Sequence, residues 1–130
     1  ARREERLIII LDYQDRRPIY EQVTEKFRVL IYQEALPAGS RLPSVRQLAM
    51  ELSINPNTIQ RAYAELEQEG LIYPVKGRGN FVADANQILK IKREDYRKEL
   101  RKTVQKGQSL GIQKGELIQV VNSCYEEEGQ

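Results

Sequence analysis

Two neighbouring stretches carry side chains whose types and spacing suit contact with nucleic acid. Residues 53–64 contain no acidic residue, and their polar positions include Asn57, Thr58, Gln60 and Arg61. Residues 76–79 are the basic sequence Lys-Gly-Arg-Gly. Amide side chains can pair in bidentate fashion with adenine, threonine can meet a thymine methyl group, and arginine can take guanine or a phosphate. This chemistry suits the major groove of DNA and the backbone beside it.

The first of these stretches is predicted to be a helix and the second the turn of a hairpin. Asn55 is a good N-cap, and Pro56 suits the first helical position, where its missing N–H costs nothing. Gly70 ends the helix, and the strands 71–75 and 80–82 join through the basic turn. Apolar residues at helical spacing give the helix a buried face: Ile59, Ala62, Tyr63 and Leu66.

Two earlier helices are expected to position this recognition helix. The first runs from Pro18 to about Ala35 and has an apolar stripe with no chemistry on it: Ile19, Val23, Phe27, Leu30 and Ile31. The second, residues 44–52, begins with a capping-box pattern of Ser44 and Gln47. A short helix, a tight turn at Ser53-Ile54 and a longer helix match helix-turn-helix spacing.

The fold class predicted is therefore mainly α with a small β-hairpin wing. Residues 12–83 form the winged helix-turn-helix, with a preceding arm, residues 1–11, whose apolar run 7–11 is an edge strand or a packed segment. Residues 84–130 form a two-helix tail, whose first helix is broken near residues 106–109.

The tail is predicted to form a dimer interface. Two amphipathic helices cannot bury both of their apolar stripes alone, so they must pack on the winged domain, on a second subunit or on both. Residues 90–106 have eight basic and three acidic side chains, whereas residues 107–130 have one and four, an asymmetry that ordinary solvated helix faces would also produce. The apolar tail positions are Tyr96, Leu100, Val104, Leu110, Leu117, Val120, Val121 and Cys124.

Composition argues against several other classes of protein. A chain of 130 residues suits one domain with a small appendage, and the net charge of +2 is weak support for nucleic-acid binding taken alone. With one cysteine and no histidine, we expect no internal disulfide, no zinc site, no cofactor and a reducing, cytoplasmic location. No apolar run reaches the roughly 18 residues of a membrane span. An enzyme is disfavoured because no phosphate loop, metal-ligand cluster or paired nucleophile is visible.

Four segments resemble the GntR family of regulators: residues 42–49 (LPSVRQLA), 55–63 (NPNTIQRAY), 65–72 (ELEQEGLI) and 77–82 (GRGNFV). Residues 18–22 (PIYEQ), residues 55–58 (NPNT) and the short tail look like its YtrA-type branch. The resemblance implies a bacterial transcription factor, usually a repressor, that binds an inverted-repeat operator as a homodimer through its tail. Pro56 and Gln60 stand where many members have DNA-touching arginines, so those contacts are not carried over, and Ser53-Ile54 replaces the glycine common in the turn.

Each candidate DNA contact has a plainer alternative. Arg46 is expected by resemblance and position to reach phosphate or a base edge, or else to be a solvated arginine. Asn57 and Thr58 face the groove or only cap the helix, and for Asn55 capping has at least equal weight. Lys76, Gly77 and Arg78 are the wing tip or an ordinary hairpin turn. Weaker backbone candidates are Ser40, Arg41 and Ser44; Cys124 is assigned a buried apolar position.

Two function classes remain open at this level. The leading one is a dimeric, sequence-specific regulator whose partner is double-stranded operator DNA. The alternative is a winged-helix module that docks on a protein through its charged tail. A small-molecule effector also stays open, although two helices leave little room within one subunit for a pocket of about 300 Å³.

Overall fold

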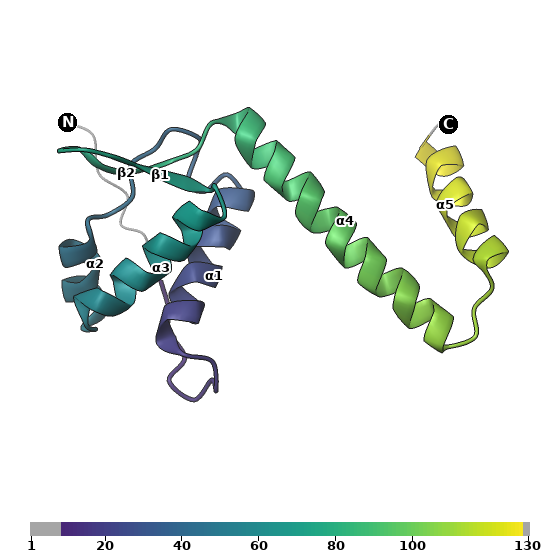
Figure 1. The fold of residues 1–130 in the computed structure, drawn as a ribbon, viewed down its shortest axis with the longest axis horizontal. Helices are drawn as coiled ribbons and strands as arrows, with labels where there is room; N and C mark the ends of the chain where they lie inside the picture. Colours follow the sequence, from purple (N-terminus) through teal and green to yellow (C-terminus); the bar gives the residue numbers. More distant parts are fainter. Residues whose placement is uncertain (1–8, 129–130) are drawn as a thin grey trace. The chain divides into compact units, whose positions relative to one another are not determined.

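The computed structural model describes residues 9–128 and confirms a mainly helical winged helix-turn-helix with C-terminal helices (Figure 1). Residues 1–8 of the expected arm, including the first two of its apolar run, lie outside the described residues. The rest of that run forms no strand; Ile9 is buried in the core and Leu11 packs against it. In chain order the elements are α1 (Ile19–Tyr32), α2 (Val45–Leu52), α3 (Pro56–Gln68), β1 (Ile72–Val75), β2 (Gly79–Val82), α4 (Ala85–Ser109) and α5 (Lys114–Glu128).

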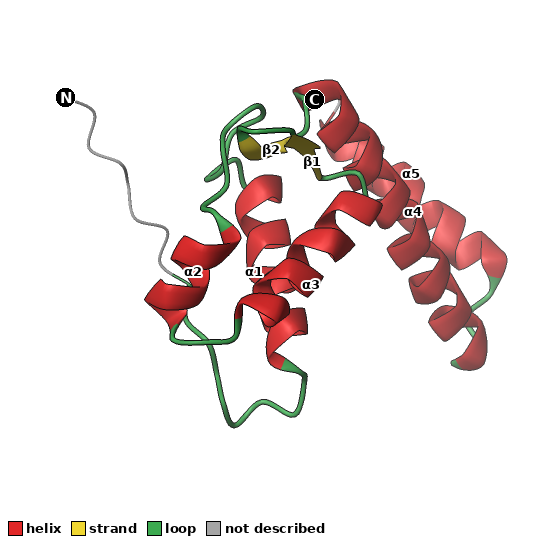
Figure 2. Ribbon diagram, turned by 60° about the vertical axis from the view of Figure 1, so that its left-hand side comes forward, coloured by secondary structure: helices red, strands yellow, loops and turns green. Residues whose placement is uncertain are grey.

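Helices α1 and α3 pack side by side and supply more of the buried core than any other pair of elements, and the two strands lie along one end of the helices (Figure 2). The rings of Phe27 and Tyr63 meet edge to face, with centroids 5.5 Å apart. Helix α1 ends at Tyr32, earlier than predicted, because Glu34 adopts a left-handed φ of 61° and the Leu36 N–H returns to the Leu30 carbonyl.

The turn between α2 and α3 forms without the glycine that is common in the family. Ser53 itself adopts the left-handed conformation, with φ 55° and ψ 44°, and the Ile54 N–H donates to the Ala49 carbonyl at 3.0 Å. Ser44 caps α2 as predicted, since its hydroxyl accepts from the Gln47 N–H at 3.0 Å. The Gln47 side chain donates to Glu51 one turn along, so only the serine half of the capping box is seen.

The hairpin is held from a second side by the segment that leads into α2. Strands β1 and β2 are antiparallel, with Ile72 opposite Val82 and Val75 opposite Gly79. On the other edge of β2, the Leu42 N–H donates to the Asn80 carbonyl at 2.9 Å and the Val82 N–H to the Ser40 carbonyl at 2.8 Å. These bonds bracket an antiparallel bridge between Arg41 and Phe81, so the wing is tied to the α1–α2 link.

The first turns of α4 pack on the winged part of the chain. The Asp84 carboxylate accepts from the Gln87 N–H at 2.9 Å and caps the helix, and Ile88 is buried in the core. Gly70 ends α3 with φ +81°, and a Cβ there would lie 2.8 Å from the Gln87 amide nitrogen. The structure divides after Lys92 into two compact units, so α4 contributes its first two turns to the first unit and the remainder to the second.

Two helices separated by a break are found in the tail, but α4 continues through Gly107 and ends at Ser109, beyond the predicted end near Lys106. A glycine weakens a helix only modestly, and here a Cβ on Gly107 would lie 3.6 Å from Leu117 Cδ1. That distance is an ordinary van der Waals contact, so packing against α5 does not itself require a glycine here. The chain turns instead at Gly111, where φ is +78° and the Ile112 N–H donates back to the Gly107 carbonyl.

Candidate nucleic-acid interface

The start of α3 is built as the sequence predicts. The Asn55 side-chain oxygen accepts from the Asn57 N–H at 2.8 Å, and Pro56 occupies the first turn. The Asn55 side chain is therefore engaged in capping, which was one of its two expected roles. Capping fixes the first turn of α3, the part of the helix that carries Asn57 and Thr58.

The outward surface of the first part of α3 is exposed and polar, and residues 55–64 contain no acidic residue, whereas Glu65 and Glu67 follow in the last turns. Asn57, Gln60 and Arg61 are exposed, whereas Thr58 is half-buried. Within residues 9–128 the side-chain amides of Asn57 and Gln60 make no hydrogen bond, so their donors and acceptors are available to an external partner. The opposite face is buried as predicted: Ile59, Ala62, Tyr63 and Leu66.

Helix α2 and the loop before it supply further candidate DNA contacts, some of which are already engaged in hydrogen bonds within the chain. Arg46 is exposed in the first turn of α2. Ser44 is engaged as the N-cap of α2, and the Ser40 hydroxyl donates to the Pro37 carbonyl at 2.6 Å. The two serines are therefore already used in holding the loop that leads into α2, which leaves Arg46 and the exposed Arg41 as the free cations of this region.

The wing turn projects its basic side chains from a backbone that requires glycine. The Arg78 N–H donates to the Val75 carbonyl at 2.9 Å across a turn whose third residue, Gly77, has φ +78°. Lys76, Gly77 and Arg78 are all exposed. A Cβ added at Gly79, where φ is +109°, would lie 3.2 Å from Arg41 Nε, which places the Arg41 guanidinium beside the wing. The pairing of residues 39–42 with β2 thus brings Arg41 next to the basic wing turn of residues 76–79, which is distant from it in the sequence.

One residue of this surface was not singled out from the sequence. Tyr20, in the first turn of α1, lies under Arg61, with the Arg61 Cζ atom 3.7 Å from the centre of its ring. The first helix was expected to carry no chemistry, and this contact adds a packing partner for Arg61 that was not anticipated from the sequence. Desolvation raises the pKa of the Tyr20 phenol, with Arg61 acting in the opposite direction, so the phenol is neutral at physiological pH. No sequence pattern signals the pairing, because Tyr20 and Arg61 meet only when α1 packs on α3.

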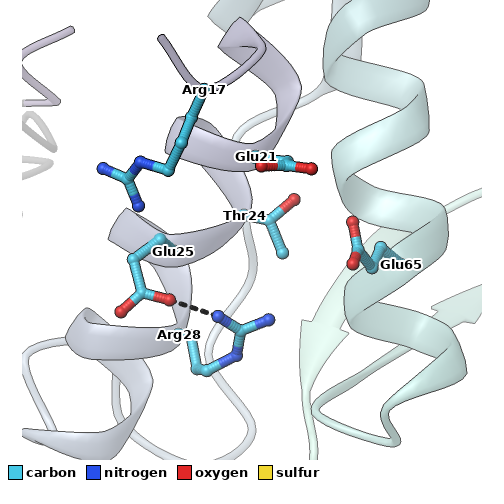
Figure 3. Close-up of a pocket in the computed structure, with 6 residues that line it drawn as sticks. All are labelled: Arg17, Glu21, Thr24, Glu25, Arg28 and Glu65. Carbon is cyan, nitrogen blue, oxygen red and sulfur yellow. Dashed lines mark hydrogen bonds and ion pairs between the residues drawn. The ribbon is translucent and has the colours of Figure 1, made fainter. Parts of the chain in front are cut away.

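A shallow polar hollow of about 180 Å³ lies between α1 and α3 (Figure 3). Glu65 projects from α3 toward α1, where Arg28 is paired with both Glu25 and Glu69. Partial burial by itself lowers the pKa of Arg28. The carboxylates of Glu69 and Glu25 outweigh this effect, so the pKa is raised above its ordinary value. The residues that line the hollow are Arg17, Glu21, Thr24, Glu25, Arg28 and Glu65. Three glutamates and two arginines thus line the hollow, whereas residues 55–64 of α3 carry no acidic side chain.

The apolar positions of the tail remain largely uncovered within one subunit. Tyr96 is 68% exposed and Val120 is 59% exposed, and Leu100, Val104, Leu110 and Val121 are exposed as well, whereas Leu117 is half-buried. Cys124 is exposed rather than buried, because none of residues 9–128 covers it. Between residues 9 and 128 no helix is long and apolar enough to cross a membrane.

Comparisons with known proteins agree with this geometry. The family described as "Bacterial regulatory proteins, gntR family" matches residues 19–82. The chain is 36% identical over 116 residues to the uncharacterized HTH-type transcriptional regulator YhcF of Bacillus subtilis (strain 168), over 88% of this chain and 95% of YhcF. It is 40% identical over 77 residues to the HTH-type transcriptional repressor YtrA of the same organism, over 59% of each chain.

Solved structures of related proteins are similar in fold to this chain. A GntR family transcriptional regulator from Listeria monocytogenes has a TM-score of 0.67 at 36% identity, over 84% of this chain and 96% of that one. AraR(DBD) in complex with operator ORE1 has a TM-score of 0.51 at 30% identity, over 59% of this chain and 94% of that one.

The fold and the exposed face of α3 define a DNA-binding transcriptional regulator of the winged helix-turn-helix class. The chain belongs to the GntR family, and within it to the YtrA-type branch.

Proposed function

We propose that this protein is a repressor that binds an inverted-repeat operator as a homodimer. Helix α3 lies in the major groove, and the β1–β2 wing lies on the adjacent backbone or in the minor groove. The observation that carries this proposal is the exposed polar surface of residues 55–64, which contain no acidic residue. Two similar proteins support the proposal: AraR(DBD) was solved in complex with an operator, and YtrA is named a transcriptional repressor. Residues 12–83 form the DNA-binding domain and residues 84–130 the dimerisation tail.

The candidate side chains divide by their chemistry into those that can recognise bases and those that can bind phosphate. Asn57, Thr58 and Gln60 are the candidate base readers because amides and hydroxyls can recognise base edges in the major groove. Arg46 and the wing residues are candidates for the backbone, where positive charge gives affinity without sequence information. The full set proposed to lie at DNA is Arg46, Asn55, Asn57, Thr58, Gln60, Arg61, Lys76, Gly77 and Arg78, with Ser40, Arg41 and Ser44 at the margin.

The tail supports the homodimer. Large exposed apolar side chains on soluble proteins mark interaction surfaces when they gather in patches. Residues 90–106 carry a net positive charge and residues 107–130 a net negative charge, so two copies have complementary charge to offer one another. The proposed interface consists of Tyr96, Leu100, Val104, Leu110, Leu117, Val120, Val121 and Cys124.

Selection of bound fragments from random duplex DNA tests the proposal. We expect a symmetric site with two half-sites related by a dyad, as a homodimer requires. Binding measured by mobility shift should weaken with salt, with the logarithm of affinity falling by about 0.9 per phosphate neutralised for each logarithmic unit of salt. Recovery of no enriched sequence, or of one asymmetric half-site alone, contradicts the proposal.

Variants separate the two kinds of contact. Arg46→Ala and Arg78→Ala should weaken binding to every duplex, whereas Asn57→Ala and Gln60→Ala should change sequence preference. Lys26→Ala is the matched control, because Lys26 is exposed on α1 and lies outside the proposed site. If all four variants bound the selected operator as tightly as wild type, the proposed placement of α3 and the wing would be wrong.

The repressor assignment needs a separate readout. The selected operator, placed across the promoter of a reporter gene, should give lower transcription when the protein is present than when it is absent. A scrambled operator controls for non-specific effects. Higher transcription with the intact operator identifies an activator instead.

A further inference from the structure

The guanidinium of Arg61 has a fixed place although the side chain is exposed. Its Cζ atom lies 3.7 Å from the centroid of the Tyr20 ring, which is the separation of a close cation–π stack. Within residues 9–128 Arg61 makes no hydrogen bond and no ion pair. Stacking uses the face of the planar group and leaves its N–H edges free to donate to an acceptor outside the protein.

The stack places Arg61 on one flank of the outward face of α3. On the side of α3 toward α2, the Tyr63 hydroxyl reaches the Pro43 carbonyl. Arg61 lies on the opposite flank, above α1. A helix in the major groove, which is about 12 Å wide, turns its central line to the base edges and its flanks to the sugar-phosphate walls. Arg61 is therefore directed to a wall rather than to the floor of the groove.

The stack also keeps Arg61 away from a nearby intramolecular partner. Glu65, one helical turn further along α3, lines the hollow together with Glu21 of α1 (Figure 3). Residues four apart on a helix can form an ion pair, but Arg61 and Glu65 do not form one here. With the guanidinium seated on Tyr20, the positive charge stays at the DNA-facing surface.

We propose that Tyr20 is a positioning residue for DNA binding: it holds Arg61 for a phosphate on the wall of the major groove. Arg61 then contributes affinity but no sequence preference. Of its two candidate partners, guanine and phosphate, this inference selects phosphate. This inference rests on the proposed function, since it requires α3 to lie in the groove.

A double-mutant cycle tests the inference on the full chain. Dissociation constants are measured for wild type, Tyr20→Ala, Tyr20→Phe, Arg61→Ala and Tyr20→Ala/Arg61→Ala, on the selected operator and on a scrambled duplex. Tyr20→Ala should weaken binding to both duplexes by a similar factor, about two- to fivefold. Tyr20→Phe keeps the aromatic face and should bind like wild type. Arg61→Ala should reduce the salt slope by about 0.9, whereas Tyr20→Ala retains the charge and the slope.

The decisive comparison is the effect of Tyr20→Ala in the Arg61→Ala background. If Tyr20 acts through Arg61, the second substitution adds no further loss, whereas a general effect on the fold persists in both backgrounds. Val29→Ala, at an exposed position of the same helix, and thermal unfolding of each variant control for damage to α1. A persistent loss, or a changed base preference in Arg61→Ala, overturns the inference alone. Absence of saturable DNA binding by wild type overturns both the inference and the proposed function.

Discussion

The hydroxyl of Tyr63 donates a hydrogen bond of 2.7 Å to the carbonyl oxygen of Pro43. This bond joins the middle of α3 to the loop that leads into α2, and the Tyr63 ring also meets Phe27 of α1 edge to face. Tyr63 is only 4% exposed and the bond is partly buried, so it is largely shielded from water. A single side chain thus links the recognition helix to the two helices that carry it, and the relative placement of Arg46 and Asn57 depends on that linkage.

Replacement of Tyr63 by Phe should reduce the free energy of unfolding by about 1–2 kcal/mol, because the Pro43 carbonyl loses its donor in a buried place. Urea unfolding followed by circular dichroism measures the change. Tyr13→Phe is the matched control, since Tyr13 is 70% exposed, and it should change stability by less than about 0.5 kcal/mol. Equal stability of the two variants would mean that the Tyr63 bond contributes nothing net.

The same side chain predicts an alkaline dependence. Burial raises the pKa of Tyr63 above its ordinary 10.0, and Glu51 adds to the shift. The unfolded chain therefore releases this proton at lower pH than the folded chain does. The stability that it contributes is fully present below about pH 10 and falls as pH rises further. The wild type should thus lose more stability than Tyr63→Phe between pH 8 and 11. A stability difference that stays constant over this range is the contrary outcome.

Asn55 tests whether capping or DNA contact dominates at the start of α3. Asn55→Ala should reduce the free energy of unfolding by about 1 kcal/mol, because the Asn57 N–H loses its acceptor. Asn55→Ser retains a capping oxygen and should restore both stability and operator affinity to near wild type. Urea unfolding and mobility shift report the two quantities separately. A serine variant that is stable but binds poorly would show a direct contact by Asn55.

Gly79→Ala should distort the wing. The backbone there has φ +109°, and the new Cβ would press on the Arg41 guanidinium. We expect a loss of about 1–3 kcal/mol of stability from the strained backbone, together with weaker DNA binding. Gly115→Ala is the matched control, because Gly115 lies in α5 with open space around it, and a helical alanine should be neutral or stabilising. Thermal unfolding and mobility shift distinguish the pair.

The proposed dimer interface of the tail can be tested by measuring the mass of the protein in solution. Leu100→Asp and Val121→Asp each place a charge on an exposed apolar position, and we expect a species of one 15.1 kDa chain instead of two. Sedimentation equilibrium measures the mass, and mobility shift should show that operator affinity falls with the loss of the second half-site. Gln105→Asp, on the other side of α4, should remain dimeric. A wild type that sediments as one chain at micromolar concentration refutes the interface.

Local signals in the sequence predicted the parts of the site that depend on near neighbours. Asn55 and Pro56 fix the start of α3, Gly70 fixes its end, and the glycines of residues 77 and 79 predict the hairpin, because caps and turns are decided within a few residues. The apolar stripe of α3 likewise identified its buried face. The end of α4 was predicted too early, because Gly107 stays helical and the chain turns at Gly111 instead.

The sequence by itself determined that this protein is a winged helix-turn-helix regulator, because its periodicity, caps and family motifs all lie within short windows of the chain. Only the tertiary structure decided which distant groups share the surface beside α3. Arg61 stacks on Tyr20 because α1 packs against α3, and Arg41 lies beside Gly79 because residues 39–42 pair with β2. The physical reason is that such pairs are set by the packing of whole elements, and no local pattern records which residues that packing brings together.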